Sequence, residues 1–317
     1  MVRNNLRLDP DFLCFAEVFS RAGYATGYIG KWHLDGGLPK KEGGLGVSAS
    51  AVGGVVPEKR RQGWQEWNGY EKAHEYFEVW KYNDQAQKVR VEGYDWEPTW
   101  NTDMALDFIR RSRDVGKPWL YYLAYGPPHL PEQCPPQFLN QYDPQAFTLP
   151  PDIDGKLTPK QEAALGKTMQ VYYGQVTSID HEIGRLLEGL QHLGIDDNTI
   201  ILYTSDHGDR LGSHCLDGQL SKSAAGPKLR GKAAPYATAF RIPLIVRWPQ
   251  RIPSGQVCDA LVNSVDLTPT ILELAGVPAI PDLPGDSMAS GCVDGTGPNN
   301  AGVWIGLGTW RAGWDGR

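Results

Sequence analysis

Apolar and polar positions along the chain fall into blocks that predict helices and strands in turn. Between residues 12 and 22 the apolar side chains lie on one helical face, with Asp11 as the expected N-terminal cap and Gly23 as the stop. The same reasoning, with Thr102 as a cap and Pro159 in a first turn, predicts helices over 103–113, 159–193 and 268–275. Short apolar runs predict strands over 24–29, 117–125, 199–204 and 242–248.

The order of these elements predicts the fold class. Strands alternate with helices, and polar residues stand where strands end, which is typical of an α/β fold with a mainly parallel central sheet and helices on both faces. In such folds the functional site lies beyond the carboxyl ends of the strands. The run at 117–125 is apolar enough for a buried strand, and the glycine-rich segment 35–63 indicates a long surface loop. Proline, glycine and small polar residues dominate after residue 278, and 304–317 shows no terminal element.

Composition and charge exclude two classes of partner. The chain has 31 basic and 37 acidic residues and a formal net charge of -6, so we expect no nucleic-acid partner. No window approaches the roughly 20 uncharged apolar residues of a membrane span. Residues 1–12 lack the apolar core of a secretory signal, and the compartment stays open. The five cysteines form no C-x-x-C pair, so neither a zinc site nor a disulfide framework is predicted.

A carboxylate and an imidazole stand side by side directly after one predicted strand. In the run T-S-D-H-G-D at 204–209, Asp206 and His207 can turn together toward one metal ion, and Gly208 allows the backbone to bend away. Taken alone, the triplet is better explained as an aspartate that caps the strand beside an ordinary surface histidine. The candidate ligand pair therefore depends on what accompanies it.

Cationic and imidazole side chains occur in three further segments. Lys31 and His33 flank a tryptophan at a strand exit, and two donors two residues apart in an extended chain point the same way, which suits an anionic oxygen. His129 is bracketed by prolines in G-P-P-H-L-P, so its position should be well defined. Each of these residues also fits an ordinary structural role. Lys31 could be a solvated lysine, His33 a half-buried histidine and His129 an imidazole packed on proline rings. Lys232, in G-K-A-A-P-Y, would by itself be assigned to the solvent-exposed surface.

In order and approximate spacing these segments together resemble the sulfatase family of the alkaline-phosphatase-like superfamily. The resembling runs are G-K-W-H, P-H-L-P, S-D-H-G-D, L-G-S-H, a lysine before P-Y, R-I-P-L-I-V-R-W-P and N-S-V-D-L-T-P-T-I-L-E-L-A-G-V. The resemblance implies an alkaline-phosphatase-like α/β fold, with 1–317 as one catalytic core. It implies that Asp206 and His207 ligate a divalent metal, expected to be Ca²⁺. It also implies that Lys31, His33, His129 and Lys232 bind the sulfate or assist the leaving group.

The chain departs from the family pattern at the nucleophile. Family members begin with a strand that ends in paired aspartates, followed by Cys-X-Pro-X-Arg or Ser-X-Pro-X-Arg, whose Cys or Ser becomes formylglycine. Asp196-Asp197 precedes a strand instead of following one, and neither Cys14 nor Cys134 has the required Pro and Arg. Ala237 and Thr238 stand where relatives carry acidic residues. We therefore expect a core that lacks the N-terminal nucleophile segment and the C-terminal subdomain, with open sheet edges, marginal stability and weak metal affinity.

The function implied by the resemblance is metal-dependent hydrolysis of sulfate monoesters, small-molecule or carbohydrate, with little or no activity in this chain alone. The metal and the cationic side chains would offset charge on the sulfuryl oxygens, and His33 or His129 would supply a proton to the leaving group. One alternative is a phosphodiesterase or phosphonate monoester hydrolase of the same superfamily. Another, from a different class, is a non-catalytic pseudoenzyme or a gene fragment.

Overall fold

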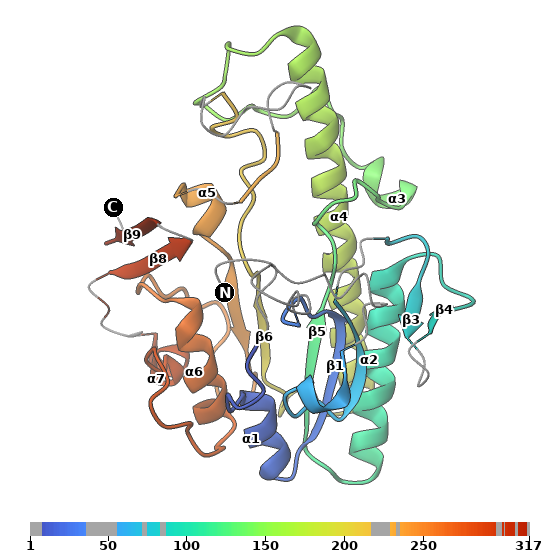
Figure 1. Ribbon diagram of the computed structural model, residues 1–317, viewed down its shortest axis with the longest axis vertical. Coiled ribbons are helices and arrows are strands. Elements are labelled where there is room, and N and C mark those ends of the chain that lie inside the picture. The colour runs from blue at the N-terminus through green and yellow to red at the C-terminus, as the bar shows by residue number, and fades with distance from the viewer. Residues whose placement is uncertain are drawn as a thin grey trace, which may run out of the picture.

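The computed structural model describes residues 8–35, 56–71, 75–82, 87–216, 229–232, 235–295, 300, 302–307 and 310–315. Four groups of strands occur in this part of the chain. The centre is a parallel sheet ordered β2-β1-β5, with an antiparallel pair, β6 and β7, beyond it (Figure 1). The central strands are β1 (Ala25–Lys31), β2 (Glu66–Tyr70), β5 (Trp119–Ala124), β6 (Ile201–Thr204) and β7 (Leu244–Arg247). Two antiparallel hairpins are β3 (Trp80–Tyr82) with β4 (Lys88–Arg90), and β8 (Val303–Leu307) with β9 (Trp310–Trp314).

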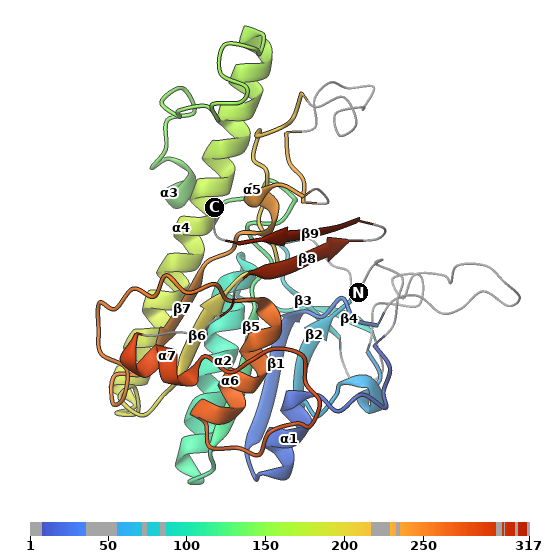
Figure 2. The same ribbon diagram turned by 90° about the vertical axis from the view of Figure 1, so that its left-hand side faces the viewer.

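The helices are distributed over both faces of these strands (Figure 2). They are α1 (Phe15–Arg21), α2 (Glu97–Asp114), α3 (Pro136–Leu139), α4 (Pro159–His192), α5 (Ala237–Phe240), α6 (Leu267–Leu274) and α7 (Ala289–Asp294), with short 3-10 turns η2 (Glu58–Arg60) and η3 (Ser264–Asp266). No helix in the described ranges is long and apolar enough to cross a bilayer.

Apolar packing explains why helices cover two faces. On one side Phe108 of α2 and Leu190 of α4 share a buried cluster with Tyr121 of β5 and Ile201 of β6. On the other side Phe19 of α1 and Leu272 of α6 form a second cluster. Because each helix buries an apolar stripe and each strand alternates its side chains, this packing removes apolar surface from water on both faces. The predicted α/β class is confirmed.

Strand β5 is less buried than the sequence predicts. Its side chains are mostly half-buried, and Tyr122 is 46% exposed. Among the described residues β5 pairs along one edge, with β1, so its apolar composition does not translate into a fully covered strand. The prediction of a buried strand at 117–125 is wrong in this respect.

Two predicted helix caps are also wrong. Helix α1 begins at Phe15 with Cys14 as its N-cap, because the Cys14 backbone N–H donates to Glu17 Oε2 at 2.9 Å. The Asp11 N–H donates to Asp9 in the preceding turn. Helix α2 starts at Glu97, so Thr102 lies inside it and donates its hydroxyl to Pro98 O at 2.9 Å. A hydroxyl at the sixth position of a helix bonds back to the carbonyl four residues earlier and does not cap the helix.

Helix α4 is the element that the sequence predicts best. It spans 34 residues, and Pro159 occupies its first turn as expected. Thr158 and Gln161 form a capping box, in which the Thr158 N–H donates to Gln161 Oε1 at 2.8 Å. Gly194, with a φ of 66°, follows its end.

The segment 35–63 and the C-terminal region contain structure that the pattern did not predict. Residues 36–55 lie outside the described part, but the chain that follows forms η2 and then β2, which pairs with β1 in parallel. Residues 303–307 and 310–314 pair as β8 and β9 where no terminal element was expected. These strands are short and only partly apolar, so their pairing partners, and not their own periodicity, define them.

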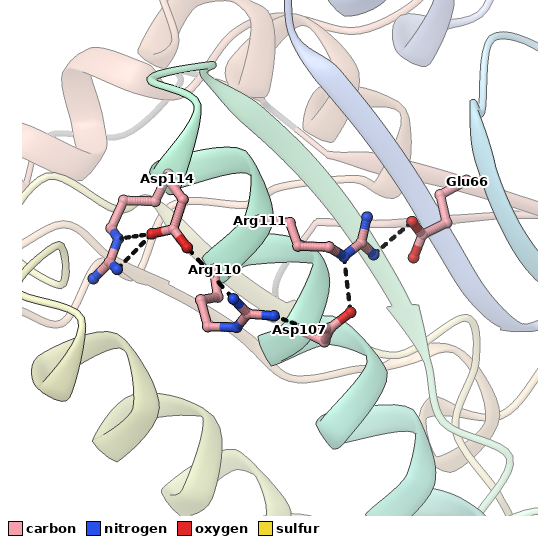
Figure 3. A network of polar contacts seen from close by, with 6 residues as sticks. Glu66, Asp107, Arg110, Arg111 and Asp114 are labelled. Carbon is pink, nitrogen blue, oxygen red and sulfur yellow. Dashed lines mark hydrogen bonds and ion pairs between the residues drawn. The ribbon is translucent and has the colours of Figure 1, made fainter.

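A surface network joins α2 to β2. Arg111 donates to Glu66 Oε2 at 2.7 Å and to Asp107 Oδ2 at 2.8 Å, and Arg110 contacts Asp107 and Asp114 (Figure 3). These groups are largely exposed, so each pair contributes about 0–1 kcal/mol. The network supplements the apolar contacts of α2 and does not replace them.

Candidate functional site

The predicted ligand pair lies in the loop that follows β6. That strand ends at Thr204, and Ser205 Oγ donates to His207 O at 2.8 Å, which folds the next residues back. As a result Asp206 Oδ2 and His207 Nε2 are 3.2 Å apart. His207 Nδ1 lies 2.8 Å from the Gly208 carbonyl, so Nδ1 carries the proton and the lone pair is on Nε2. The structure thus brings one oxygen and one nitrogen donor together.

Two lysines surround this pair. Lys232 Nζ lies 2.6 Å from His207 Nε2, so its ammonium donates to the imidazole lone pair. Lys31, at the end of β1, is more deeply placed: burial lowers its pKa, the charge of Lys232 lowers it further, and Asp206 raises it. These mutual influences show that Lys31, Lys232 and Asp206 share one electrostatic neighbourhood.

His129 belongs to the same neighbourhood. Burial lowers the pKa of its imidazole, the hydrogen bond to the Leu130 carbonyl opposes this, and the charges of Lys31 and Lys232 lower the pKa further. His129 Nδ1 is 2.8 Å from Leu130 O, so in the neutral ring the proton sits on Nδ1 and Nε2 carries the lone pair. The lowered pKa favours the neutral ring of His129.

Lys31 and His33 were expected to point the same way because the chain between them was taken to be extended, and it is not. Strand β1 ends at Lys31, and His33 has a φ of 55°, in the left-handed region. Two-residue alternation applies to extended backbone, so it does not relate these side chains. The argument that they point the same way for that reason is wrong, and a role for the half-buried His33 in the site stays a prediction.

Two residues that sequence analysis did not assign link the site loops. Arg230 Nε donates to Asp209 Oδ2 at 3.0 Å, and Arg230 Nη2 donates to Pro128 O at 2.7 Å. Asp209 stands inside the S-D-H-G-D run and could have been singled out there. Arg230 carries no sequence signal, because an arginine two residues before a lysine in a glycine-containing loop is ordinary.

Two further residues donate hydrogen bonds to the backbone carbonyls of the loop that carries His129. The Tyr76 hydroxyl, fully buried, donates to His129 O at 3.1 Å and lies 3.3 Å from Leu130 O. Gln175 of α4 donates its side-chain amide to Pro131 O at 3.1 Å and Gln133 O at 2.9 Å. The Gln133 N–H also donates to Pro131 O at 2.8 Å, so side-chain and backbone donors together satisfy the carbonyls of this loop.

The metal-ligand chemistry of the described residues is partial. Within the described ranges no group of three or more His, Cys, Asp or Glu side chains is arranged to hold a metal ion. Asp206 and His207 provide two donors, whereas Ca²⁺ takes about six to eight oxygen ligands. Asp206 and His207 can therefore supply two of the ligands of a divalent cation, but the two residues alone do not form a complete site.

Neither cysteine considered at the sequence level is an activated nucleophile. Burial raises the pKa of Cys134 to about 11, and burial together with Glu17 raises the pKa of Cys14. A thiol with a raised pKa is protonated at neutral pH and reacts poorly. The raised pKa values of Cys14 and Cys134, like the lack of the required Pro and Arg near them, therefore argue against either thiol as the nucleophile.

Comparison with known proteins identifies the family. The sulfatase family model matches residues 6–277. The chain belongs to the sulfatase family. An ulvan-active sulfatase from Formosa agariphila is 29% identical over 284 residues, covering 89% of this chain and 50% of that protein. The chain spans about half the length of the curated relatives it matches.

Solved structures agree with the alkaline-phosphatase-like fold of this chain. A putative sulfatase from Bacteroides fragilis matches with a TM-score of 0.79 and 26% identity, covering 94% of this chain and 63% of that one. A protein in complex with its substrate D-glucosamine-2-N,6-O-disulfate matches with a TM-score of 0.72 and 22% identity over 98% of this chain and 71% of that one. A phosphonate monoester hydrolase from Silicibacter pomeroyi shares the fold at a TM-score of 0.72 and 23% identity, with 96% of this chain and 66% of that one covered.

Proposed function

We propose that this chain forms the anion-binding part of an enzyme that hydrolyses sulfate monoesters, with a sulfated carbohydrate as the substrate. The observation that carries the proposal is the meeting of Lys232 Nζ and His207 Nε2 at 2.6 Å, beside Asp206 and in the field of Lys31. Membership of the sulfatase family supplies the reaction class. The sulfated-sugar complex of a structural neighbour supports the substrate class.

The lysines would act on the sulfuryl oxygens. A sulfate monoester carries negative charge on these oxygens, and charge develops on the leaving oxygen as the ester bond breaks. Lys31 and Lys232 approach from different parts of the chain, and the partial burial of Lys31 places its charge where water screens it least. Ammonium groups held in such positions stabilise the anion without a cost of reorganisation.

A histidine would supply the proton that the leaving oxygen needs. His129 is kept neutral by burial and by the neighbouring lysines. A bound sulfate places negative charge among those lysines, which raises the pKa of His129 and favours its protonation. His33 is the second candidate for the proton donor, and the choice between the two rests on variants of each.

We also propose that a divalent cation, expected to be Ca²⁺, binds with Asp206 and His207 among its ligands. Its charge would polarise a sulfuryl oxygen and lower the pKa of the attacking nucleophile. His207 Nε2 has one lone pair, which in this structure faces the ammonium of Lys232. The cation and Lys232 therefore compete for the same atom.

Phosphoryl transfer is the alternative that the same residues would serve. Lysines and imidazoles bind phosphoryl and sulfuryl oxygens alike, and the phosphonate monoester hydrolase shares the fold. A third possibility is a chain that binds anions without turning them over.

A substrate panel tests these proposals. Purified protein is incubated with an aryl sulfate, a 6-O-sulfated glucosamine and an aryl phosphonate monoester, and binding and turnover are measured for each. We expect both sulfate esters to bind more tightly than the phosphonate monoester. Faster turnover of the phosphonate monoester would support the alternative reaction. Failure to bind any of the three would contradict the proposal.

A further inference from the structure

We propose that Arg230 is a positioning residue that ties the His129 loop to the Lys232 segment and so sets the spacing between the imidazole and the ammonium. This inference rests on the proposed anion site, because it assigns these two groups to one ligand. The contacts of Arg230 in the described structure are with Asp209, Pro128 and Tyr172, none of which is a predicted site residue. Its evidence is the set of contacts made by one guanidinium.

Arg230 contacts three segments that are far apart in sequence. Nε donates to Asp209 at a separation of 21 residues, and Nη2 donates to Pro128 O at a separation of 102 residues. The guanidinium also lies over the Tyr172 ring of α4, with 4.9 Å between its carbon and the ring centroid. The rigid planar fork of arginine can make such contacts together, whereas a lysine presents a single point charge.

The Arg230 contacts are shielded from water. The Arg230 side chain is 11% exposed and that of Asp209 is 15% exposed. Water competes weakly for hydrogen bonds at this depth, and the charge pair is screened less than a surface pair. The geometry of this junction is therefore better defined than that of the exposed pairs on α2.

Asp209 connects the junction to the predicted metal ligands. Its Oδ1 accepts the Leu211 N–H at 3.0 Å and the Gly231 N–H at 3.2 Å, while Oδ2 receives Arg230. Gly231 directly precedes Lys232, and Asp209 lies two residues after His207. One carboxylate thus fixes the start of the Lys232 segment against the loop after β6.

The bond from Arg230 to Pro128 joins the other half of the site. Pro128 directly precedes His129, and the carbonyls beyond it are held by Tyr76 and Gln175. Tyr76 and Gln175 hold the carbonyls that follow Pro128, and the Arg230 bond holds Pro128 itself against the Lys232 segment. The same charge also contributes to the lowered pKa of His129.

An ion pair at the opposite end of β6 offers a matched control. Arg247 of β7 donates to the Asp196 carbonyl and carboxylate at 3.4 Å each, so it also combines one backbone and one carboxylate acceptor. In register Arg247 faces Ile201, the first residue of β6, whereas the site follows the last residue of that strand. Loss of this arginine removes a similar set of bonds away from the site.

The experiment compares Arg230→Gln, Arg230→Lys and Arg247→Gln with the parent chain. Amide hydrogen exchange is followed in peptides covering 125–134 and 229–232, binding of inorganic sulfate is measured by calorimetry, and thermal unfolding reports stability. We expect Arg230→Gln to speed exchange in both segments and to weaken sulfate binding about tenfold, which corresponds to about 1.4 kcal/mol. Arg230→Lys is expected to restore little, because one ammonium does not span both acceptors. Arg247→Gln should leave exchange in these segments and sulfate affinity unchanged.

The outcomes separate a positioning role of Arg230 from an effect of its charge alone. Unchanged exchange in both segments of Arg230→Gln overturns the positioning role, whatever the sulfate data show. Parental sulfate affinity in Arg230→Gln, or full recovery in Arg230→Lys, also overturns it, because charge alone would then suffice. If the parent chain binds no sulfate while exchange still increases in both segments, the positioning role of Arg230 holds and the proposed anion site fails.

Discussion

Lys232 Nζ and His207 Nε2 lie 2.6 Å apart, so the ammonium of one predicted anion-binding residue uses the lone pair of one predicted metal ligand. This contact places the two functions proposed for the site in competition. A cation that binds His207 has to displace Lys232, and it meets the repulsion of the ammonium while doing so.

Removal of Lys232 should therefore strengthen metal binding. In Lys232→Met the lone pair of His207 is no longer occupied by the Lys232 ammonium, and we expect affinity for Ca²⁺ or Mn²⁺ to rise roughly three- to tenfold. Calorimetric titration with each metal measures this. Lys156→Met, which removes an exposed lysine bonded to Asp152 O, is the control. Equal metal affinities in the parent and Lys232→Met would contradict the assignment of His207 as a ligand.

Glu97 predicts a pH dependence of stability. Burial raises the pKa of this carboxyl to about 7 in the folded protein, above its ordinary value of 4.5. The folded state then holds the proton more tightly than the unfolded state, so stability is full below about pH 4.5 and is lost as the pH rises through 7. The loss is on the order of 3 kcal/mol. Denaturant unfolding of Glu97→Gln between pH 5 and 8.5 should show a flatter profile and higher stability at the alkaline end. A parallel profile for both proteins would argue against a buried, protonated Glu97.

Two tyrosines, Tyr76 and Tyr121, allow a hydroxyl that supports the site to be compared with one that does not. Tyr76→Phe removes the bond to His129 O, and we expect it to cost about 1–3 kcal/mol in unfolding free energy and to weaken sulfate binding. The Tyr121 hydroxyl is buried without a hydrogen bond in the described structure, so Tyr121→Phe should be neutral or stabilising. Chemical denaturation and sulfate titration of both variants measure the difference. Equal effects of the two changes would show that the Tyr76 bond does not support the loop.

The surface network on α2 should matter little. Arg111→Gln removes the contacts to Glu66 and Asp107, and we expect it to lower stability by no more than about 1 kcal/mol, with a smaller effect at high salt. Thermal unfolding at low and at 1 M salt tests this. A loss of several kcal/mol would mean that the β2 strand depends on this ion pair.

The sequence predicted well those elements whose signals are local. Helix α4 was predicted at both ends because Pro159 and Gly194 give the chemistry of its start and stop within a few residues. Strand β2 was missed because its definition depends on pairing with β1, which no local pattern encodes. Asp11 does not cap the first helix. The Cys14 N–H donates to the side chain of Glu17, three residues further on, so Cys14 is the cap.

The same distinction applies to the site. Asp206 and His207 are neighbours in sequence, so their proximity could be predicted, and the resemblance to sulfatases indicated that Lys31, His129 and Lys232 belong with them. The contacts that join the loops run through Arg230 and Asp209, which are separated by 21 residues and match no motif as a pair. The orientation of His33 was not predicted, because its positive φ could not be anticipated from a run that looked extended.

The central claim is that Lys31 and Lys232 serve one anion site, and a double-mutant cycle of sulfate binding tests it most directly. Calorimetry with inorganic sulfate is performed on the parent chain, Lys31→Met, Lys232→Met and the double variant. The account predicts saturable binding by the parent, a roughly tenfold or greater loss in each single variant, and a loss in the double variant smaller than the sum of the two. Strictly additive losses, or sulfate binding that survives the double substitution, would contradict a shared site.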